Sequence, residues 1–120
     1  MRTGLALVGL ITGLALAAPA GAQVTPDGKN RKVRVENGGS VTISNLYASP
    51  VTSKTWEEDL LGQGVIPAGQ SRLANIDNGT AECSYDLKAV LVGGRQVVRR
   101  TVNVCAVTKW VIRDSGDSIE

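Results

Sequence analysis

The chain has 120 residues with 13 basic and 11 acidic side chains, no histidine, no phenylalanine and two cysteines. Its net charge of +2 gives no electrostatic footprint for nucleic acid, and two Trp and two Tyr residues offer little of the aromatic platform on which bases stack. The lack of histidine excludes Ser-His-Asp and Cys-His catalysis and histidine-ligated metal sites. Nucleic acid is therefore not an expected partner.

The first 22 residues have the pattern of a cleaved signal peptide. A short basic start at Met1–Arg2 precedes an uncharged run over 5–18, and the small-x-small sequence at 20–22 is typical of a cleavage site. The apolar run is too short for a comfortable membrane span. We therefore expect cleavage after Ala22 and a periplasmic or secreted mature chain without a membrane span.

The mature chain begins with a polar segment, residues 23–31, which predicts a flexible N-terminus. Alternating apolar residues over 32–36 and 41–47, joined by the turn signal Asn37-Gly38-Gly39, predict a β-hairpin. Pro50 ends the second strand, because proline has no N–H to donate to a ladder.

The next segment, residues 54–62, is the one candidate for a short helix. Thr55 is a plausible N-cap, acidic residues follow in the first turn, and Gly62 is a stop signal. These features predict a helical turn near 55–61. Further along, a strand end with a turn, a strand and a second turn are expected at 65–69, 71–76 and 77–80.

The last hairpin has the clearest pattern. Residues 83–91 alternate between apolar and polar side chains, Gly93-Gly94 predicts a two-residue turn, and 96–105 is the return strand. This register pairs Tyr85 with Val102 and Ala89 with Val98.

Cys83 and Cys105 are the two cysteines, and such a pair in an oxidising compartment predicts a structural disulfide. The hairpin register sets Cys83 opposite Val104, one residue short of its partner. A β-bulge in the return strand or a three-residue loop would bring the two together, and the sequence leaves both open. A redox-active pair or a metal site is the competing interpretation, but catalytic pairs are usually closer in sequence and two thiolates make an incomplete zinc shell.

A final strand is expected at 110–112, followed by a disordered tail at 114–120. Strands at short intervals with turn signals between them are typical of a small β-sandwich or barrel. The sequence therefore predicts an all-β fold, a small antiparallel β-sandwich of about six or seven strands over 32–113, with one short helical turn.

Several motifs resemble a group of small secreted proteobacterial proteins. The motifs are VTISNLYASP at 41–50, WEEDLLG at 56–62, IPAGQS at 66–71, CSYDLKAV at 83–90 and VNVC at 102–105. The resemblance covers residues 32–112 and implies a periplasmic or secreted β-sandwich, with no established activity. The chain departs from the group at Val92, where the group tends to have an acidic residue before the glycine turn, and this weakens any cation-binding role for that turn.

Four carboxylates form a candidate calcium site: Glu57, Glu58, Asp59 and Asp86. Calcium prefers oxygen ligands and is available outside the cytoplasm, but the segment does not match an EF-hand loop, and a charge run is more often a solvated face. The same carboxylates would serve a small hydrolase as acid and base, although the domain has little room for a cleft. No cofactor is expected.

Basic side chains gather on the last hairpin at Lys88, Arg95, Arg99 and Arg100. If Lys88 and Arg99 face each other, their like charges favour an anion or an acidic partner, whereas the simpler interpretation is a charged edge that resists aggregation. The aromatic residues Tyr47, Trp56 and Trp110 would be a hot spot for a protein partner if exposed. If buried, they fill the core of a chain without phenylalanine, which is the simpler expectation.

These observations predict an exported, non-enzymatic β-sandwich domain that binds another protein or an envelope component. The candidate binding residues are Tyr47, Trp56, Arg95, Arg99 and Arg100. A calcium- or small-ligand-binding module of the same fold is the alternative, and a small hydrolase is the third possibility.

Overall fold

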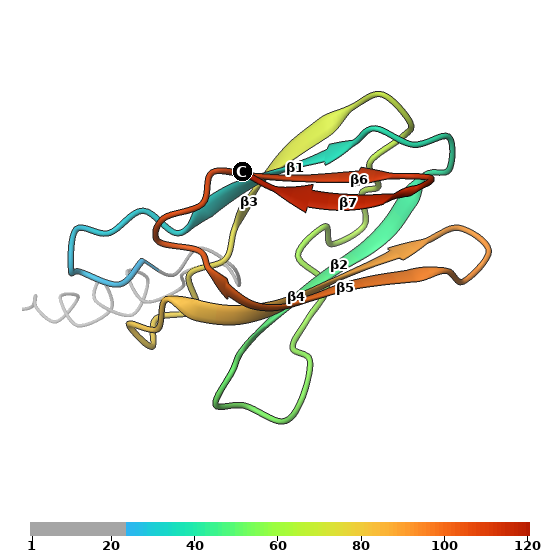
Figure 1. Cartoon of the computed structure of the whole chain (residues 1–120). Helices are drawn as coiled ribbons and strands as arrows, with labels where there is room; N and C mark the ends of the chain where they lie inside the picture. The colour runs from blue at the N-terminus through green and yellow to red at the C-terminus, as the bar shows by residue number, and fades with distance from the viewer. Residues whose placement is uncertain (1–23) are drawn as a thin grey trace, which may run out of the picture.

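The computed structural model describes residues 24–120, which form seven β-strands in two sheets (Figure 1). The strands are β1 Lys32–Asn37, β2 Ile43–Pro50, β3 Ser71–Asn75, β4 Ser84–Leu91, β5 Gln96–Asn103, β6 Lys109–Arg113 and β7 Gly116–Ile119. The predicted all-β, sandwich-like fold is confirmed. The predicted signal peptide, residues 1–22, lies outside the described residues. In the described part of the chain, no helix has the length and hydrophobicity needed to cross a membrane.

The two sheets contain four and three strands, in the orders β3-β1-β6-β7 and β2-β4-β5. Figure 1 shows them as separate layers. Among the described strand pairs, the antiparallel expectation fails at one place, because β1 and β6 run parallel. A long connection through the other sheet makes this parallel pairing possible, since parallel neighbours need a crossover.

The core lies between the two sheets and is built from alternate strand residues. In β1 the inward residues are Val33 and Val35, and in β4 every second residue from Tyr85 to Leu91 is buried. Trp110 of β6 is 0% exposed, so this aromatic side chain fills the core, as expected for a chain without phenylalanine.

The predicted hairpin between 32–36 and 41–47 is wrong, because β1 and β2 belong to different sheets. Asn37 explains the crossing. Its buried side-chain amide donates to the carbonyls of Val41 (2.8 Å) and Ile66 (2.9 Å), and its Oδ1 accepts from the Gly39 N–H (3.0 Å). These bonds hold the turn that carries the chain from one layer to the other.

The predicted helical turn at 55–61 is also wrong, since the segment forms bends and turns instead of a helix. The chain here covers the outer edge of β2. The Leu60 N–H donates to the Leu46 carbonyl (2.7 Å), and Ile66 exchanges hydrogen bonds with Ile43. Covering an edge strand satisfies its free backbone groups, and this requirement takes precedence over a weak local helix signal.

The β4–β5 hairpin closes through a three-residue loop rather than the predicted two-residue turn. A hydrogen bond from the Leu91 N–H to the Arg95 carbonyl (2.9 Å) leaves residues 92–94 as the loop. Ala89 consequently pairs one residue earlier than expected, with Val97.

A β-bulge then shifts the register of β5 by one residue opposite Asp86. Beyond the bulge the predicted pair Tyr85–Val102 is confirmed. The chain therefore uses both devices that the sequence left open, a longer loop and a bulge in the return strand.

Cys83 and Cys105 form the predicted disulfide, with Cα atoms 5.4 Å apart. The Val104 N–H donates to the Cys83 carbonyl (2.8 Å), and a turn after Asn103 then carries Cys105 toward its partner. The bond therefore closes the end of the hairpin away from its loop.

The two terminal segments differ from expectation. The predicted tail at 114–120 contains β7, which pairs with β6 as the edge strand of the four-stranded sheet. The predicted flexible segment at 23–31 is anchored where it is described, because Thr25 and Arg31 are buried. Both ends are held by side chains distant in sequence.

Candidate functional site

The outer face of the β2-β4-β5 sheet carries rows of side chains that cross its strands. Strand pairing aligns Tyr47, Lys88 and Val98 in one row. The next row joins Ser49 to Asp86. These β4 side chains point outward because the residues between them fill the core, so this face is the one that the sandwich does not pack against its second sheet.

Trp56 reaches this face from the loop that follows β2, the green loop that extends away from the four-stranded sheet in Figure 1. The Lys88 Nζ lies 4.7 Å from the centroid of the Trp56 ring and 5.0 Å from that of the Tyr47 ring, and the Arg100 Cζ lies 5.8 Å from the Trp56 ring. These are cation–π distances. We call Tyr47, Trp56, Lys88 and Arg100 the basic-aromatic cluster.

Hydrogen bonds fix the loop that presents Trp56. The buried Ser49 hydroxyl donates to the Thr55 carbonyl (2.9 Å), and the Ser53 N–H donates to the Pro50 carbonyl (2.8 Å). The Trp56 ring is half-buried against the sheet face rather than inserted into the core. The loop therefore holds an aromatic side chain in place while leaving part of it accessible.

Arg100 is positioned by the β5 bulge. Thr101 has a φ of 56°, an uncommon conformation for a residue other than glycine. Its N–H donates to Asp86 Oδ1 (2.9 Å), and Arg100 Nη1 donates to Asp86 Oδ2 (3.1 Å). Asp86 thus bridges the bulge and orients the guanidinium of Arg100, whose side chain is 67% exposed.

A cavity of about 160 Å³ lies between the loop and the bulge. Its walls are polar, and the lining residues include two basic residues, one acidic residue and Trp56. The lining residues are Ser49, Ser53, Lys54, Thr55, Trp56, Asp86 and Arg100.

The other two predicted binding arginines lie elsewhere. Arg99 binds Asp117 of β7 through Nε (2.9 Å) and Nη2 (2.9 Å), which links the two sheets at one edge. Arg95 Nη1 donates to the Arg113 carbonyl (3.3 Å). Lys88 pairs with Val98 rather than with Arg99, so the like-charged pair suggested by the sequence does not form.

The four carboxylates of the predicted calcium site do not converge, and within 24–120 no three acidic or cysteine side chains form a group that could hold a metal ion. Asp59 accepts hydrogen bonds from the N–H groups of Leu46 (2.9 Å) and Leu61 (3.0 Å). Asp86 is engaged in the bulge. Glu58 lines a separate groove beside β3, and Glu57 is exposed.

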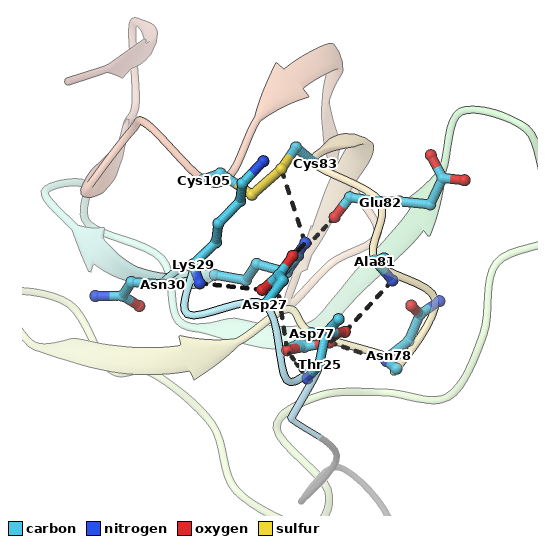
Figure 2. A network of polar contacts seen from close by, with 12 residues as sticks. Thr25, Asp27, Lys29, Asn30, Asp77, Asn78, Ala81, Glu82, Cys83 and Cys105 are labelled. Carbon is cyan, nitrogen blue, oxygen red and sulfur yellow. Dashed lines mark hydrogen bonds and ion pairs between the residues drawn. A yellow bond between two sulfur atoms is a disulfide. The ribbon is translucent and has the colours of Figure 1, made fainter.

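A second polar cluster, which the sequence does not indicate, surrounds the buried Arg31 side chain. Figure 2 shows its network of polar contacts. Arg31 Nη2 lies 2.7 Å from Asp27 Oδ2, and Nη1 lies 3.8 Å from Asp77 Oδ2. Asp77 accepts from both the N–H and the hydroxyl of Thr25, each at 2.6 Å. The Asp27–Arg31 spacing is a local signal, but Thr25 and Asp77 are 52 positions apart, so no short-range pattern reveals the cluster.

This second cluster keeps its carboxylates charged. Hydrogen bonds from the Arg31 side chain, helped by the Lys29 N–H, hold the pKa of Asp27 far below its usual range. Burial acts to raise the pKa of Asp77, but hydrogen bonds from Thr25 and Gly79 and the charge of Arg31 outweigh it and leave the pKa lowered. In return, the hydrogen bond to Asp27 raises the pKa of Arg31. The cluster is therefore a set of ion pairs and a structural anchor.

Comparisons of the chain with protein-family models, with curated proteins and with solved structures gave no match.

Proposed function

We propose that this chain is an exported, non-enzymatic binding domain that docks another protein through the basic-aromatic cluster. The single observation that carries the proposal is the stacking of Lys88 and Arg100 on the half-buried rings of Tyr47 and Trp56. Tyr, Trp and Arg are the residue types that dominate protein interfaces.

The cluster is ordered before any partner arrives. Lysine and arginine side chains normally lose considerable rotamer freedom on binding. Here Lys88 lies over two rings, and Arg100 is held by both Trp56 and Asp86. Much of this rotamer freedom has already been lost when the domain folds, so binding a partner costs less entropy.

Export is supported by two independent features. The N-terminal sequence has the pattern of a signal peptide, and the Cys83–Cys105 disulfide is typical of an oxidising compartment. We accordingly place the mature domain in the periplasm or outside the cell.

Site-specific photo-crosslinking in intact cells tests the proposal. A photo-reactive residue replaces Val98, whose side chain is 38% exposed and lies in the same row as Lys88. As a matched control, a photo-reactive residue replaces Leu73, whose side chain is 51% exposed and lies on a strand of the other sheet. We expect one protein to crosslink at Val98 and not at Leu73, and Trp56→Ala to abolish the product. With that protein purified, Trp56→Ala should weaken binding about 30-fold, the cost of a hot-spot residue.

The competing functions give different results. Equal crosslinking at both positions, or a Val98 product that survives Trp56→Ala, would exclude docking through this cluster. A melting temperature that falls in EDTA would instead support the calcium-binding alternative, because a bound ion stabilises only the folded state.

A further inference from the structure

We infer that the partner presents an acidic side chain whose carboxylate enters the cavity beside Trp56, between Lys54 and Arg100. This inference rests on the proposed function and specifies the chemistry of the partner. It makes the basic-aromatic cluster a receptor for a glutamate or aspartate on a protein surface.

The charges around the cavity are incompletely paired. Asp86 binds Arg100 at 3.1 Å. Neither Lys54 nor Lys88 forms an ion pair with any other residue in the described range 24–120. The cavity lining therefore contains one more cation than anion, and the Lys88 ammonium stands nearby on the same Trp56 ring. One incoming carboxylate balances the excess within the cavity lining.

Arg100 retains the donors that such a carboxylate needs. A guanidinium carries five N–H donors in a planar fork. Among the described residues, Arg100 donates a single side-chain hydrogen bond, from Nη1 to Asp86. The remaining donors suit a second carboxylate, and a charge-assisted bond to a pre-oriented arginine is among the stronger polar contacts.

The surroundings favour a single carboxylate over a phosphate-rich surface. Glu57 and Glu58 follow Trp56 directly and are exposed outside the cavity lining, so an extended anionic surface laid over this whole loop would meet like charges. A single acidic side chain reaches Lys54 and Arg100 while the rest of the partner surface stays away from Glu57 and Glu58.

Binding of two matched peptides tests the inference. One is a short fluorescent peptide with a cluster of glutamates, and its counterpart has glutamine at the same positions. We expect the wild-type domain to bind the glutamate peptide about tenfold more tightly by fluorescence anisotropy. Arg100→Gln should remove the difference, whereas Lys32→Gln, which removes an exposed lysine on the other sheet, should preserve it.

Equal affinity for the two peptides, or an equal loss in Lys32→Gln, would overturn the inference. Tighter binding to phosphatidylglycerol vesicles than to the glutamate peptide would overturn it in favour of a phosphate surface.

Different results would contradict the proposed function and the present inference. A Trp56-dependent crosslink at Val98 that Arg100→Gln leaves intact keeps the docking face and rejects the carboxylate, while peptide selectivity without any crosslink rejects the docking partner.

Discussion

Arg31 contacts Cys83, with its Nη2 3.8 Å from the Cys83 Sγ. Arg31 Nε also donates to the Glu82 carbonyl (2.6 Å), beside the disulfide (Figure 2). The guanidinium is fully buried, and a buried charge is tolerated only when it is paired and hydrogen-bonded. The segment before β1, the turn around Asp77 and the disulfide therefore form one unit packed around the buried Arg31 side chain.

We expect Arg31→Met to destabilise the domain strongly. The methionine fills similar space but leaves Asp77 buried without its cationic neighbour, and breaking a buried ion pair costs far more than removing a surface charge. The melting temperature should fall by roughly 10 °C. Circular dichroism during heating measures this fall.

The matched control is Arg34→Met. Arg34 is exposed on β1, where its Nη1 donates to the Ser71 hydroxyl (3.2 Å). Its loss should change the melting temperature little, because exposed polar pairs contribute little. Equal shifts in the two variants would contradict the structural role of Arg31.

The same unit predicts how stability depends on pH. Asp27 and Asp77 have lowered pKa values in the folded protein, so below about pH 5 the unfolded chain binds protons that the folded chain does not. Their contribution to stability is complete above the usual carboxyl pKa of 3.8 and is lost as the pH falls through the lowered values. Asp114 acts in the same direction through its hydrogen bonds to Ser40.

Urea unfolding at pH 7 and pH 3 measures this dependence. The urea midpoint of the wild type should be lower at pH 3 than at pH 7. The midpoint of Asp77→Asn should decrease less between these two pH values, because the amide does not titrate. A variant whose midpoint falls as steeply as that of the wild type would show that Asp77 is not a source of the dependence.

The disulfide should contribute substantially to stability. It joins residues 22 positions apart, and the chain-entropy model assigns a loop of this size about 3 kcal/mol. We expect the double variant Cys83→Ala, Cys105→Ala to lose about this free energy of unfolding in urea. Dithiothreitol should lower the free energy of unfolding of the wild type toward that of the double variant and should leave that of the variant unchanged. A change in the variant on reduction would show that dithiothreitol acts on stability by a route other than this disulfide.

The sequence predicted those parts of the fold that depend on residues close together along the chain. The strict alternation of β4 gave its buried face correctly, and two cysteines at the ends of one hairpin gave the disulfide. The Asn37 turn was also visible, but not its consequence, because the sheet that receives β2 depends on hydrogen bonds from Asn37 to Val41 and Ile66. A turn signal indicates that the chain changes direction and does not indicate which strand it then joins.

The candidate site was predictable by residue type and not by arrangement. Residue type alone marks Tyr47, Trp56 and Arg100 as candidates, and the structure brings them together around Lys88. The same criterion also marks Arg99, but its guanidinium binds Asp117 at the edge between the sheets. Arg99 and Arg100 face opposite sides of the sheet because successive side chains alternate along a strand, and the register that decides which of them faces outward depends on the three-residue loop, which no local pattern fixed.

The sequence also did not predict the role of Asp117 at the C-terminal end, where the expected tail forms β7. All four residues of β7 are half-buried, so the strand has no alternation to reveal it. Asp117 Oδ2 accepts from Trp110 Nε1 (2.7 Å) and from Arg99 Nε (2.9 Å). One carboxylate thus satisfies the polar atom of the largest core side chain and joins β7 to the opposite sheet.

We therefore expect Asp117→Ala to destabilise the domain by about 1–3 kcal/mol, because it leaves the Trp110 N–H buried without an acceptor. Asp117→Asn should cost less, since its amide oxygen still accepts from the indole. Urea unfolding gives the free energies, and the NMR signal of the Trp110 indole proton should exchange with solvent faster in the alanine variant alone. If both variants match the wild type in stability and exchange, β7 does not anchor the core through this bond.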